Sequence, residues 1–518
     1  MLDRIRRTPL PLVAVAIVAM VMAIALTSLN GPGLSTDAVN YLSTADNVAR
    51  GIGFRNFEGD LYVLWPPLYP AILAGIELLF GVGPQVSASL LNALAFGGIV
   101  LLMGILARRI LERDFILCSW AVGGVLLSTS TFAISVNVAS DPIFIVLALS
   151  FLILFDRYAR DGDRASYVGL IAVCGLACLQ RYIGATLILV GSVGIVYARW
   201  SRPRQGMGEA AVFAGLSVAP LGAWIVRNYL VSGTFLGVRD PETWKPMENL
   251  LDIGFKAARW FVPYQLSSHP AFWVVLVVGL AVVVLVRRKR LVRPLAGVEP
   301  EPITFVLILF PIIYLAAMVV LTKSIDHKNI LYDDRLYLPA YFPLLVLFLL
   351  VIRLMLRLVL PEAASRMRRY ALLGAAAVWL LFPAYGMYKF WVRSINDKGI
   401  AYYNIYNTPT YQDSAVTSNL KTWVSDSDLA VYSNYPAAVY LETRRIVGSL
   451  PGRADFYGVP QPLEGYAGRW PGRLPAVLVW YEPNTKRNLY SLSELATLAE
   501  LRPLFTSGDG AIYALTPR

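Results

Sequence analysis

The sequence predicts a polytopic α-helical membrane protein that ends in a small α/β domain. The chain is 57% hydrophobic and 15% charged, and its mean hydropathy is +0.56, whereas a soluble globular protein has roughly 25% charged residues. Long apolar runs recur up to about residue 390, and short apolar runs alternate with turn residues after it. We therefore predict a membrane module at residues 1–390, with a first outer loop at 30–84, and an α/β domain at 391–518.

The apolar runs define about eleven candidate membrane spans, each near or above the length that crosses a bilayer. The first run is longer than the apolar region of a signal peptide, so we expect an uncleaved first helix. Segment 68–80 is shorter and contains Glu77, so we expect it to lie along the membrane surface. The candidate spans are residues 10–29, 85–107, 115–136, 141–156, 166–180, 182–198, 210–230, 271–286, 303–321, 337–352 and 370–388.

The distribution of positive charge predicts the orientation. The net charge is +12, but the basic residues cluster between apolar runs, as the positive-inside rule requires, so we predict no nucleic-acid partner. If segment 68–80 does not cross, all of these clusters share the cytoplasmic side. This predicts a multi-pass protein of the cell (inner) membrane with a cytoplasmic N-terminus and an extracytoplasmic C-terminal domain. The clusters lie at residues 4–7, 108–113, 157–164, 199–204, 287–293 and 353–369.

The first outer loop carries an unusual carboxylate. Asp37 follows the first apolar run closely, and an acid at the membrane surface is costly and usually functional. Ser35, Thr36 and Asp37 are all good N-cap types and Gly51 is a natural helix stop, so a short helix is predicted between them. A purely structural role for Asp37, as a cap and helix-dipole partner, is the alternative.

The order of short motifs in this loop resembles a known family. The motifs are Asp37-x-x-x-Tyr41, Ala45, Gly51-x-Gly53 and Trp65-Pro66-Pro67-Leu68-Tyr69-Pro70. They are similar to the first extracytoplasmic loop of GT-C-fold glycosyltransferases of the protein mannosyltransferase and aminoarabinose transferase superfamily. In that family the loop aspartate is the catalytic base and faces a polyprenyl-phosphate sugar donor.

The resemblance implies a GT-C-like fold, Asp37 as the general base and inversion at the anomeric carbon. It also makes Tyr41, Trp65 and Tyr69 candidates for donor binding. Some members, notably those that transfer aminoarabinose, carry a lysine just before the Pro-Pro-Leu, and this chain departs from that pattern with Trp65. Trp65 is either a membrane anchor or a stacking surface for a sugar ring.

A second acid and a nearby arginine lie in later outer turns. Asp141 precedes Pro142 at the start of a span, an arrangement that can be a plain helix start. The resembled family has an active-site acid after the third span, and Asp141 matches that position. Arg181 and Tyr182 stand between two apolar runs, where the guanidinium either snorkels to the surface or binds a lipid phosphate.

Two further arginines stand in motifs similar to those of the same family. Arg227 lies in Trp224-x-x-Arg227-Asn228-Tyr229, and Arg335 lies in Asp333-Asp334-Arg335-Leu336-Tyr337-Leu338-Pro339. Both are candidates for donor phosphate binding, with an interfacial anchor as the alternative.

The C-terminal domain alternates predicted strands and helices. We predict strands at residues 429–432, 445–447, 476–481 and 511–515, and helices at 414–423, 437–442 and 491–498. Ser433-Asn434-Tyr435-Pro436 follows the first of these strands as either a ligand-binding turn or an ordinary one. Family members often carry such domains, which help to hold the acceptor.

The sequence lacks the residues that several other kinds of site require. The chain has three cysteines, all in apolar runs, and two histidines, so we predict neither a disulfide framework nor a metal site. No cofactor is required, although a divalent ion between a phosphate and a carboxylate remains compatible. The overall prediction is a membrane glycosyltransferase that moves a sugar from a polyprenyl phosphate to a hydroxyl of a protein, glycolipid or glycan, with Asp37 and Asp141 as catalytic residues. A transporter or a non-enzymatic receptor with an outer ligand-binding domain is the alternative.

Overall fold

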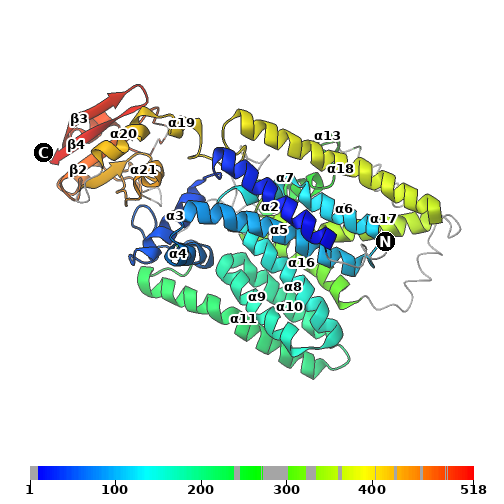
Figure 1. Ribbon diagram of the computed structural model, residues 1–518. Coiled ribbons are helices and arrows are strands. Elements are labelled where there is room, and N and C mark those ends of the chain that lie inside the picture. Colours follow the sequence, from blue (N-terminus) through cyan, green and yellow to red (C-terminus); the bar gives the residue numbers. More distant parts are fainter. Residues whose placement is uncertain are drawn as a thin grey trace.

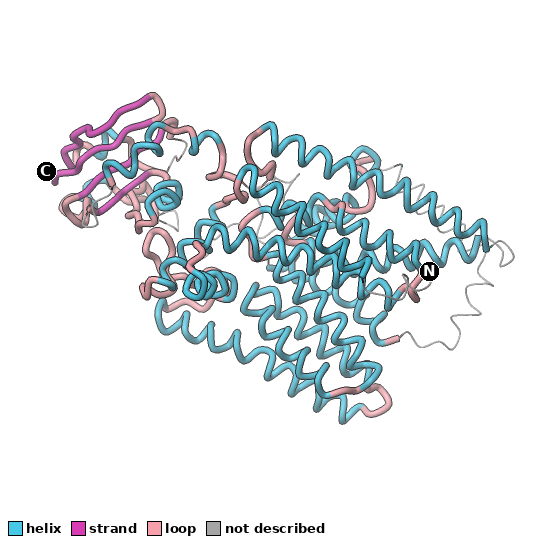
Figure 2. Tube along the Cα trace, in the orientation of Figure 1, coloured by secondary structure: helices cyan, strands magenta, loops and turns pink. Residues whose placement is uncertain are grey.

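The protein consists of a helical bundle with a small α/β domain at one end (Figure 1). The computed structural model describes residues 10–237, 246–269, 271, 301–321, 334–359, 365–402, 404–424, 429–455, 459–484, 486 and 488–517. All strands of the described sheet lie in the C-terminal domain, and the rest of the described chain is mostly helical (Figure 2). The predicted fold class is therefore confirmed.

Seven helices in the described residues are long and apolar enough to cross a membrane. Two shorter apolar helices, α9 (Arg164–Gln180) and α10 (Ala185–Ala198), pack between the longer ones. The predicted span at 271–286 lies outside the described residues, so the total of eleven stays a prediction. The long helices are α2 (Leu10–Asn30), α5 (Pro84–Ile110), α8 (Asp141–Asp161), α11 (Pro203–Ser232), α16 (Pro302–Leu321), α17 (Tyr341–Val359) and α18 (Ser365–Asn396).

The predicted span at 115–136 is bent rather than one continuous helix. It is broken into α6 (Phe115–Leu126) and α7 (Thr129–Val136), which are bent by 46°. The break lies at Ser128, whose side chain accepts a hydrogen bond from the backbone N–H of Thr131 and so caps α7. Because a cap satisfies the new helix start internally, the break is tolerated within an apolar segment.

The first outer loop folds into two short helices, α3 (Thr36–Ala49) and α4 (Leu68–Phe80). Ser35 is the N-cap of α3, since its side chain accepts a hydrogen bond from Ala38 N–H, and Asp37 lies in the first turn. Gly51 follows the helix with a φ of +78°, as expected of a glycine stop. The Asp37 side chain is therefore not needed as the cap, which removes its simplest structural role.

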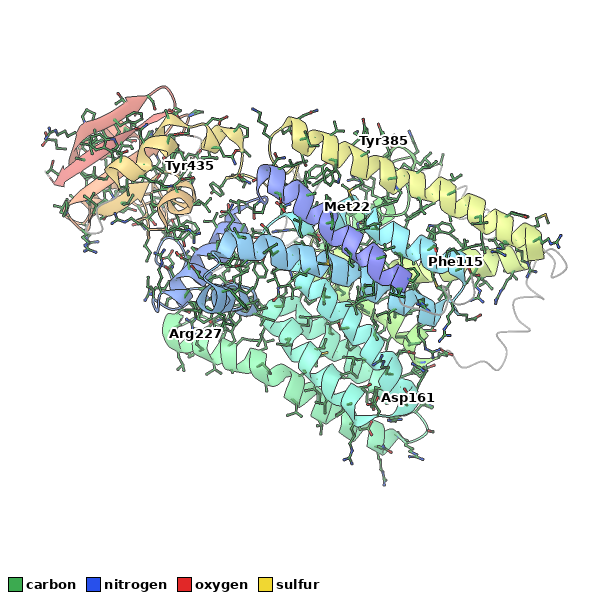
Figure 3. All side chains as sticks on the ribbon, viewed as in Figure 1. Met22, Phe115, Asp161, Arg227, Tyr385 and Tyr435 are labelled. Carbon is green, nitrogen blue, oxygen red and sulfur yellow. The ribbon has the colours of Figure 1, made fainter. Side chains whose placement is uncertain are left out.

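The bundle has two distinct ends (Figure 3). Arg227, at the end of α11, lies on the same side as Tyr435 of the C-terminal domain, and Asp161 lies at the opposite end. The N-terminal and C-terminal ends of the chain are likewise far apart (Figure 1). The first outer loop thus shares one end of the bundle with the C-terminal domain.

The C-terminal sheet has the strand order β1-β2-β4-β3 in the described residues. Strand β1 (Ala430–Ser433) runs parallel to β2 (Ala476–Tyr481), and β4 (Gly510–Pro517) is antiparallel to β2 and to β3 (Ala499–Ser507). Helices α20 (Ala415–Trp423) and α21 (Pro436–Thr443) pack on one face, where their side chains form a core with Val431 and Val479.

Three details of the domain differ from the prediction. The sequence analysis missed β3, because this edge strand is largely exposed and contains Glu500, Arg502 and Pro503, which are depleted in strands. Residues 445–447 form no regular strand, and only an isolated bridge joins Gly448 to Tyr432. The predicted helix at 491–498 is reduced to α22 (Leu492–Leu495).

A buried carboxylate fastens the C-terminal domain to α3. Asp46 Oδ2 accepts a hydrogen bond of 2.7 Å from the hydroxyl of Tyr440, and Asp46 Oδ1 lies 3.4 Å from a guanidinium nitrogen of Arg444. Arg50 donates to the carbonyl of Arg444, and Val447 N–H donates to the carbonyl of Phe57. A buried charge with such partners is costly to disturb, so we expect the interface to be rigid.

Asp46→Ala is expected to weaken this docking by about 1–3 kcal/mol, because the Tyr440 hydroxyl and the Arg444 guanidinium lose a buried acceptor. The weaker docking would be measured as faster amide hydrogen exchange in residues 436–448. Asp60→Ala changes an exposed carboxylate of the same loop and is the control. Unchanged exchange in Asp46→Ala would show that apolar packing alone holds the domain.

Candidate active site

Two loops that are about a hundred residues apart cross next to Asp37. Gly33 N–H donates to the carbonyl of Val136 and Val138 N–H donates to the carbonyl of Gly33, both at 3.0 Å. The side-chain amide of Asn92, on α5, donates to the carbonyls of Asn137 at 2.7 Å and Ala139 at 3.1 Å. This crossing places the start of α3, with Asp37, beside the start of α8, with Asp141.

The crossing requires a residue without a side chain at position 33. A Cβ on Gly33 would lie 1.8 Å from Asn137 Oδ1. The Asn137 side chain is itself buried and donates to the carbonyl of Ala133. The Asn137 side chain therefore cannot move away from a Cβ at position 33 without losing that hydrogen bond.

Gly33→Ala is expected to lower the free energy of unfolding by about 1–3 kcal/mol through this overlap. A lower midpoint of thermal unfolding would measure it, and the double variant Gly33→Ala/Asn137→Ala should recover most of the loss. Gly75→Ala, in α4, is the control because nothing lies within 4 Å of a Cβ added there. Equal stability of Gly33→Ala and the native chain would contradict the tight crossing.

Two ion pairs form the centre of the site. Arg335 Nη2 lies 2.7 Å from Asp37 Oδ2, and Arg181 Nη1 lies 2.6 Å from Asp141 Oδ1. The Asp37 side chain is 29% exposed and the Asp141 side chain only 4%. The structure thus brings together both predicted acids and two of the predicted arginines, with Asp37 as the accessible acid.

Ser140 joins Tyr41 to the Asp141–Arg181 pair. The hydroxyl of Ser140 lies 3.3 Å from the Tyr41 hydroxyl and accepts from Arg181 Nη1 at 3.4 Å. Burial raises the pKa of Tyr41, and the negative charge of Asp37 raises it further. Tyr41 therefore stays a neutral hydroxyl that can donate and accept hydrogen bonds inside the network.

Aromatic rings surround Tyr41 on the side of the first loop. Trp65 lies edge-on at a ring-centroid distance of 6.2 Å, and Tyr69 at 5.2 Å. Tyr69 is buried and its hydroxyl donates to Asn92 Oδ1 at 3.3 Å, so it braces the loop crossing from behind. Trp65 is partly exposed and stacks on Tyr62 at a ring-centroid distance of 5.8 Å.

Neighbouring residues hold the Arg335 segment in place. Asp334 accepts hydrogen bonds from the indole of Trp260, at 3.0 Å, and from the hydroxyl of Ser130. The Tyr314 hydroxyl, on α16, donates to the carbonyl of Leu336 at 2.8 Å. Arg335 also lies within electrostatic range of Arg181. Arg335 is therefore held at the accessible carboxylate, with the Arg181–Asp141 pair in its vicinity.

Tyr182 and Arg227 lie in a separate group that joins α11 to the first loop. The Tyr182 hydroxyl donates to the carbonyl of Val63 at 3.1 Å and accepts from the Trp224 indole at 3.2 Å. Arg227 donates to the carbonyl of Tyr62 at 3.2 Å, and its guanidinium lies 4.7 Å from the centroid of the Trp224 ring. These contacts place both residues at the junction of α11 and the first loop, and their donor-binding role stays a prediction.

Sequence reasoning missed Ser140 and Tyr314. Ser140 stands directly before Asp141 and resembles a simple N-cap, but its side chain does not cap α8. Instead its hydroxyl contacts Tyr41 and Arg181, as described above. Tyr314 lies within an apolar run, and its hydroxyl was the one available signal, because a buried tyrosine hydroxyl usually needs a hydrogen-bond partner.

The site has few ligands for a metal ion. In the described residues, no group of three or more histidine, cysteine, aspartate or glutamate side chains is placed to hold one. The positive charge of the site instead comes from Arg181 and Arg335. This arrangement suits an anion that carries its own negative charge, such as a phosphate.

Comparison with solved structures identifies the fold. ArnT from Cupriavidus metallidurans in the apo state aligns with a TM-score of 0.61 and 13% identity, over 98% of this chain and 97% of that chain. The same protein bound to undecaprenyl phosphate aligns with a TM-score of 0.62 and 14% identity, with the same coverage. The chain has the GT-C glycosyltransferase fold. The resemblance inferred from the first outer loop is thereby confirmed at the level of fold.

A family model agrees with this GT-C assignment over part of the chain. Residues 62–209 match the family described as dolichyl-phosphate-mannose-protein mannosyltransferase. No curated protein sequence matches the chain significantly. The fold and the long apolar helices together indicate a multi-pass membrane protein.

Proposed function

We propose that this GT-C protein transfers a sugar from a polyprenyl phosphate to a hydroxyl acceptor at the outer face of the membrane, with Asp37 as the general base. The observation that carries the proposal is the accessible Asp37 carboxylate, held by Arg335 beside the buried Asp141–Arg181 pair. The polyprenyl donor is supported by the similar ArnT structure, which is bound to undecaprenyl phosphate.

The geometry leaves one oxygen of Asp37 available for proton transfer. Oδ2 is paired with Arg335, whereas Oδ1 has no hydrogen-bond partner within the described part of the chain. A general base must come within hydrogen-bond reach of the hydroxyl that it activates. Oδ1 would take the acceptor proton while the acceptor oxygen forms its bond to the anomeric carbon.

The leaving group in this proposal is the lipid phosphate. As the bond between the anomeric carbon and the phosphate oxygen breaks, its electron pair goes to that oxygen and the phosphate gains charge. Arg181 and Arg335 can stabilise this charge, which is largest in the transition state. Asp141, being almost fully buried, acts as a positioning residue for Arg181.

Trp65, Tyr41 and Tyr69 complete the proposed donor site in different ways. Trp65 offers a partly exposed ring for the sugar, and Tyr41 lies beside Arg181 through their shared partner Ser140. Tyr69 supports the loop crossing through Asn92. We propose that Arg227 and Tyr182 contact the donor lipid farther from the reacting carbon, at the end of α11.

The experiment is sugar transfer by the purified full chain in lipid nanodiscs. Each member of a panel of radiolabelled polyprenyl-phosphate sugars is supplied with membrane extract as the acceptor source, and release of polyprenyl phosphate is followed. We expect turnover with at least one donor, and undiminished turnover with a chelator because two arginines supply the counter-charge. Release from no donor, or movement of intact donor across the bilayer of closed vesicles that contain the full chain, would contradict the proposal and favour a receptor or a transporter.

The proposed orientation can be tested separately. With a cytoplasmic N-terminus, residues 391–518 lie outside the cell. Protease added to intact spheroplasts should then release the C-terminal domain, and protease added to inside-out vesicles should not. The reverse pattern would place the site on the cytoplasmic side.

A further inference from the structure

Three tyrosines lie in a row between the start of α3 and the sheet of the C-terminal domain. Tyr406, Tyr411 and Tyr435 are all partly exposed, and we call them the tyrosine strip. The ring centroids of Tyr406 and Tyr411 are 5.5 Å apart, and those of Tyr411 and Tyr435 are 5.9 Å apart. The strip is thus continuous within the C-terminal segment of the chain, from Tyr406 to the turn after β1.

One end of the strip lies next to the proposed base. The backbone N–H of Tyr406 donates to the carbonyl of Leu34 at 3.0 Å, and its hydroxyl lies against the side chain of Thr36. Thr36 precedes Asp37 in the chain. A ligand on the strip would therefore extend toward the accessible carboxylate.

The other end lies at the carboxyl end of β1. Tyr435 follows β1, at the edge of a parallel strand pair, where α/β domains commonly bind ligands. Buried Asn434 holds this turn by two hydrogen bonds to the backbone of Tyr481, at 2.8 and 2.9 Å. The turn is therefore a rigid platform, which lowers the cost of ordering a ligand on it.

Charged groups from both parts of the protein flank the strip. Lys486 lies 5.0 Å from the centroid of the Tyr435 ring. Glu58, in the first outer loop, accepts from the Ser449 hydroxyl at 3.3 Å and interacts electrostatically with Lys486 and Tyr406. Burial raises the pKa of Glu58, and the nearby Asp60 adds to this effect. Rings flanked by a carboxylate and an ammonium group can stack on sugar rings and bind their hydroxyls.

We propose that the tyrosine strip, with Glu58 and Lys486, binds a glycan acceptor and directs its hydroxyl to Asp37. This inference rests on the proposed function and names its acceptor class. A peptide that adds a strand beside the tyrosine strip is disfavoured, because the outer edge of β1, which leads to Tyr435, is already bridged. Gly448 N–H donates to the carbonyl of Val431 at 2.7 Å.

The test measures oligosaccharide binding without the donor. The full-length Asp37→Asn protein is titrated in detergent with hexasaccharides of glucan, mannan, galactan and chitin type. We expect at least one to bind, and Tyr435→Ala or Glu58→Gln in that background to weaken its binding about 3–10-fold, the effect of one lost aromatic or charged contact. Tyr435→Phe keeps the ring and should retain most of the affinity.

Tyr513→Ala is the matched control, because Tyr513 packs with the core on the other face of the sheet. Binding of none of the hexasaccharides, or equal weakening by Tyr513→Ala, would overturn the strip as a glycan site. If the native chain transfers no sugar but binds a hexasaccharide through the strip, the proposed function is refuted and the glycan site is retained. If donor turnover is normal and Tyr435→Ala leaves the acceptor KM unchanged, only the role of the strip in acceptor binding is refuted.

Discussion

Asp37→Asn is expected to lower the turnover of lipid-linked sugar by about 10²–10⁴-fold, the usual contribution of a positioned general base. The amide keeps the size of the side chain and can still accept a hydrogen bond from Arg335, but it cannot take the proton of the acceptor hydroxyl. The measurement is kcat for polyprenyl phosphate release by the purified variant. Donor affinity should change much less, because the base acts mainly in the transition state.

A surface acid of the same loop provides the control for this experiment. Asp60 is exposed, so Asp60→Asn should leave kcat within about twofold, as a surface substitution away from the chemistry does. The thermal unfolding midpoint of Asp37→Asn should match that of the native chain, because the Asp37 side chain is not the cap of α3. Retention of full activity in folded Asp37→Asn would defeat the assignment of the base.

Arg335→Gln is expected to lower kcat by about 10²–10³-fold, the loss typical of removing one preorganised group that stabilises charge in a transition state. The change removes the partner of Asp37 Oδ2 and one of the two positive charges near the proposed phosphate position. It should also weaken binding of undecaprenyl phosphate, which can be measured directly with the purified protein. The two readouts together separate a role in phosphate binding from a general structural defect.

Arg335→Lys refines this test. Lysine retains the charge but not the planar fork, so its activity should fall between those of the native chain and Arg335→Gln. Arg55→Gln, which changes an exposed arginine of the first outer loop that donates to the carbonyl of Gly59, is the control. If Arg335→Gln loses activity no more than Arg55→Gln does, Arg335 has no part in the reaction.

These two predictions depend on different kinds of evidence. Asp37 was identified from a motif order that resembles a family, and the structure adds that the carboxylate is accessible while Asp141 is not. Arg335 was one of three arginine candidates of similar standing in the sequence. The structure distinguishes them, because Arg181 and Arg335 pair with the two acids and Arg227 packs against Trp224.

Local patterns were sufficient for most helices. Each long apolar run in the described residues became a helix, since a chain in a bilayer must satisfy its backbone hydrogen bonds internally. The same reasoning failed at Ser128, where one side-chain cap splits a run. It also failed at β3, whose polar edge position leaves no alternating apolar pattern to read.

The sequence by itself determined the fold class of the protein and singled out Asp37 as the candidate acid, because bilayer burial imposes a composition that few other constraints produce, and an acid beside a span is rare. Only the tertiary structure decided which groups meet that acid. Residues about one hundred positions apart meet at the Gly33 crossing, and residues about three hundred or more positions apart meet in the Arg335–Asp37 pair and where the tyrosine strip contacts Thr36. Such contacts follow from packing between distant segments, which no local periodicity records.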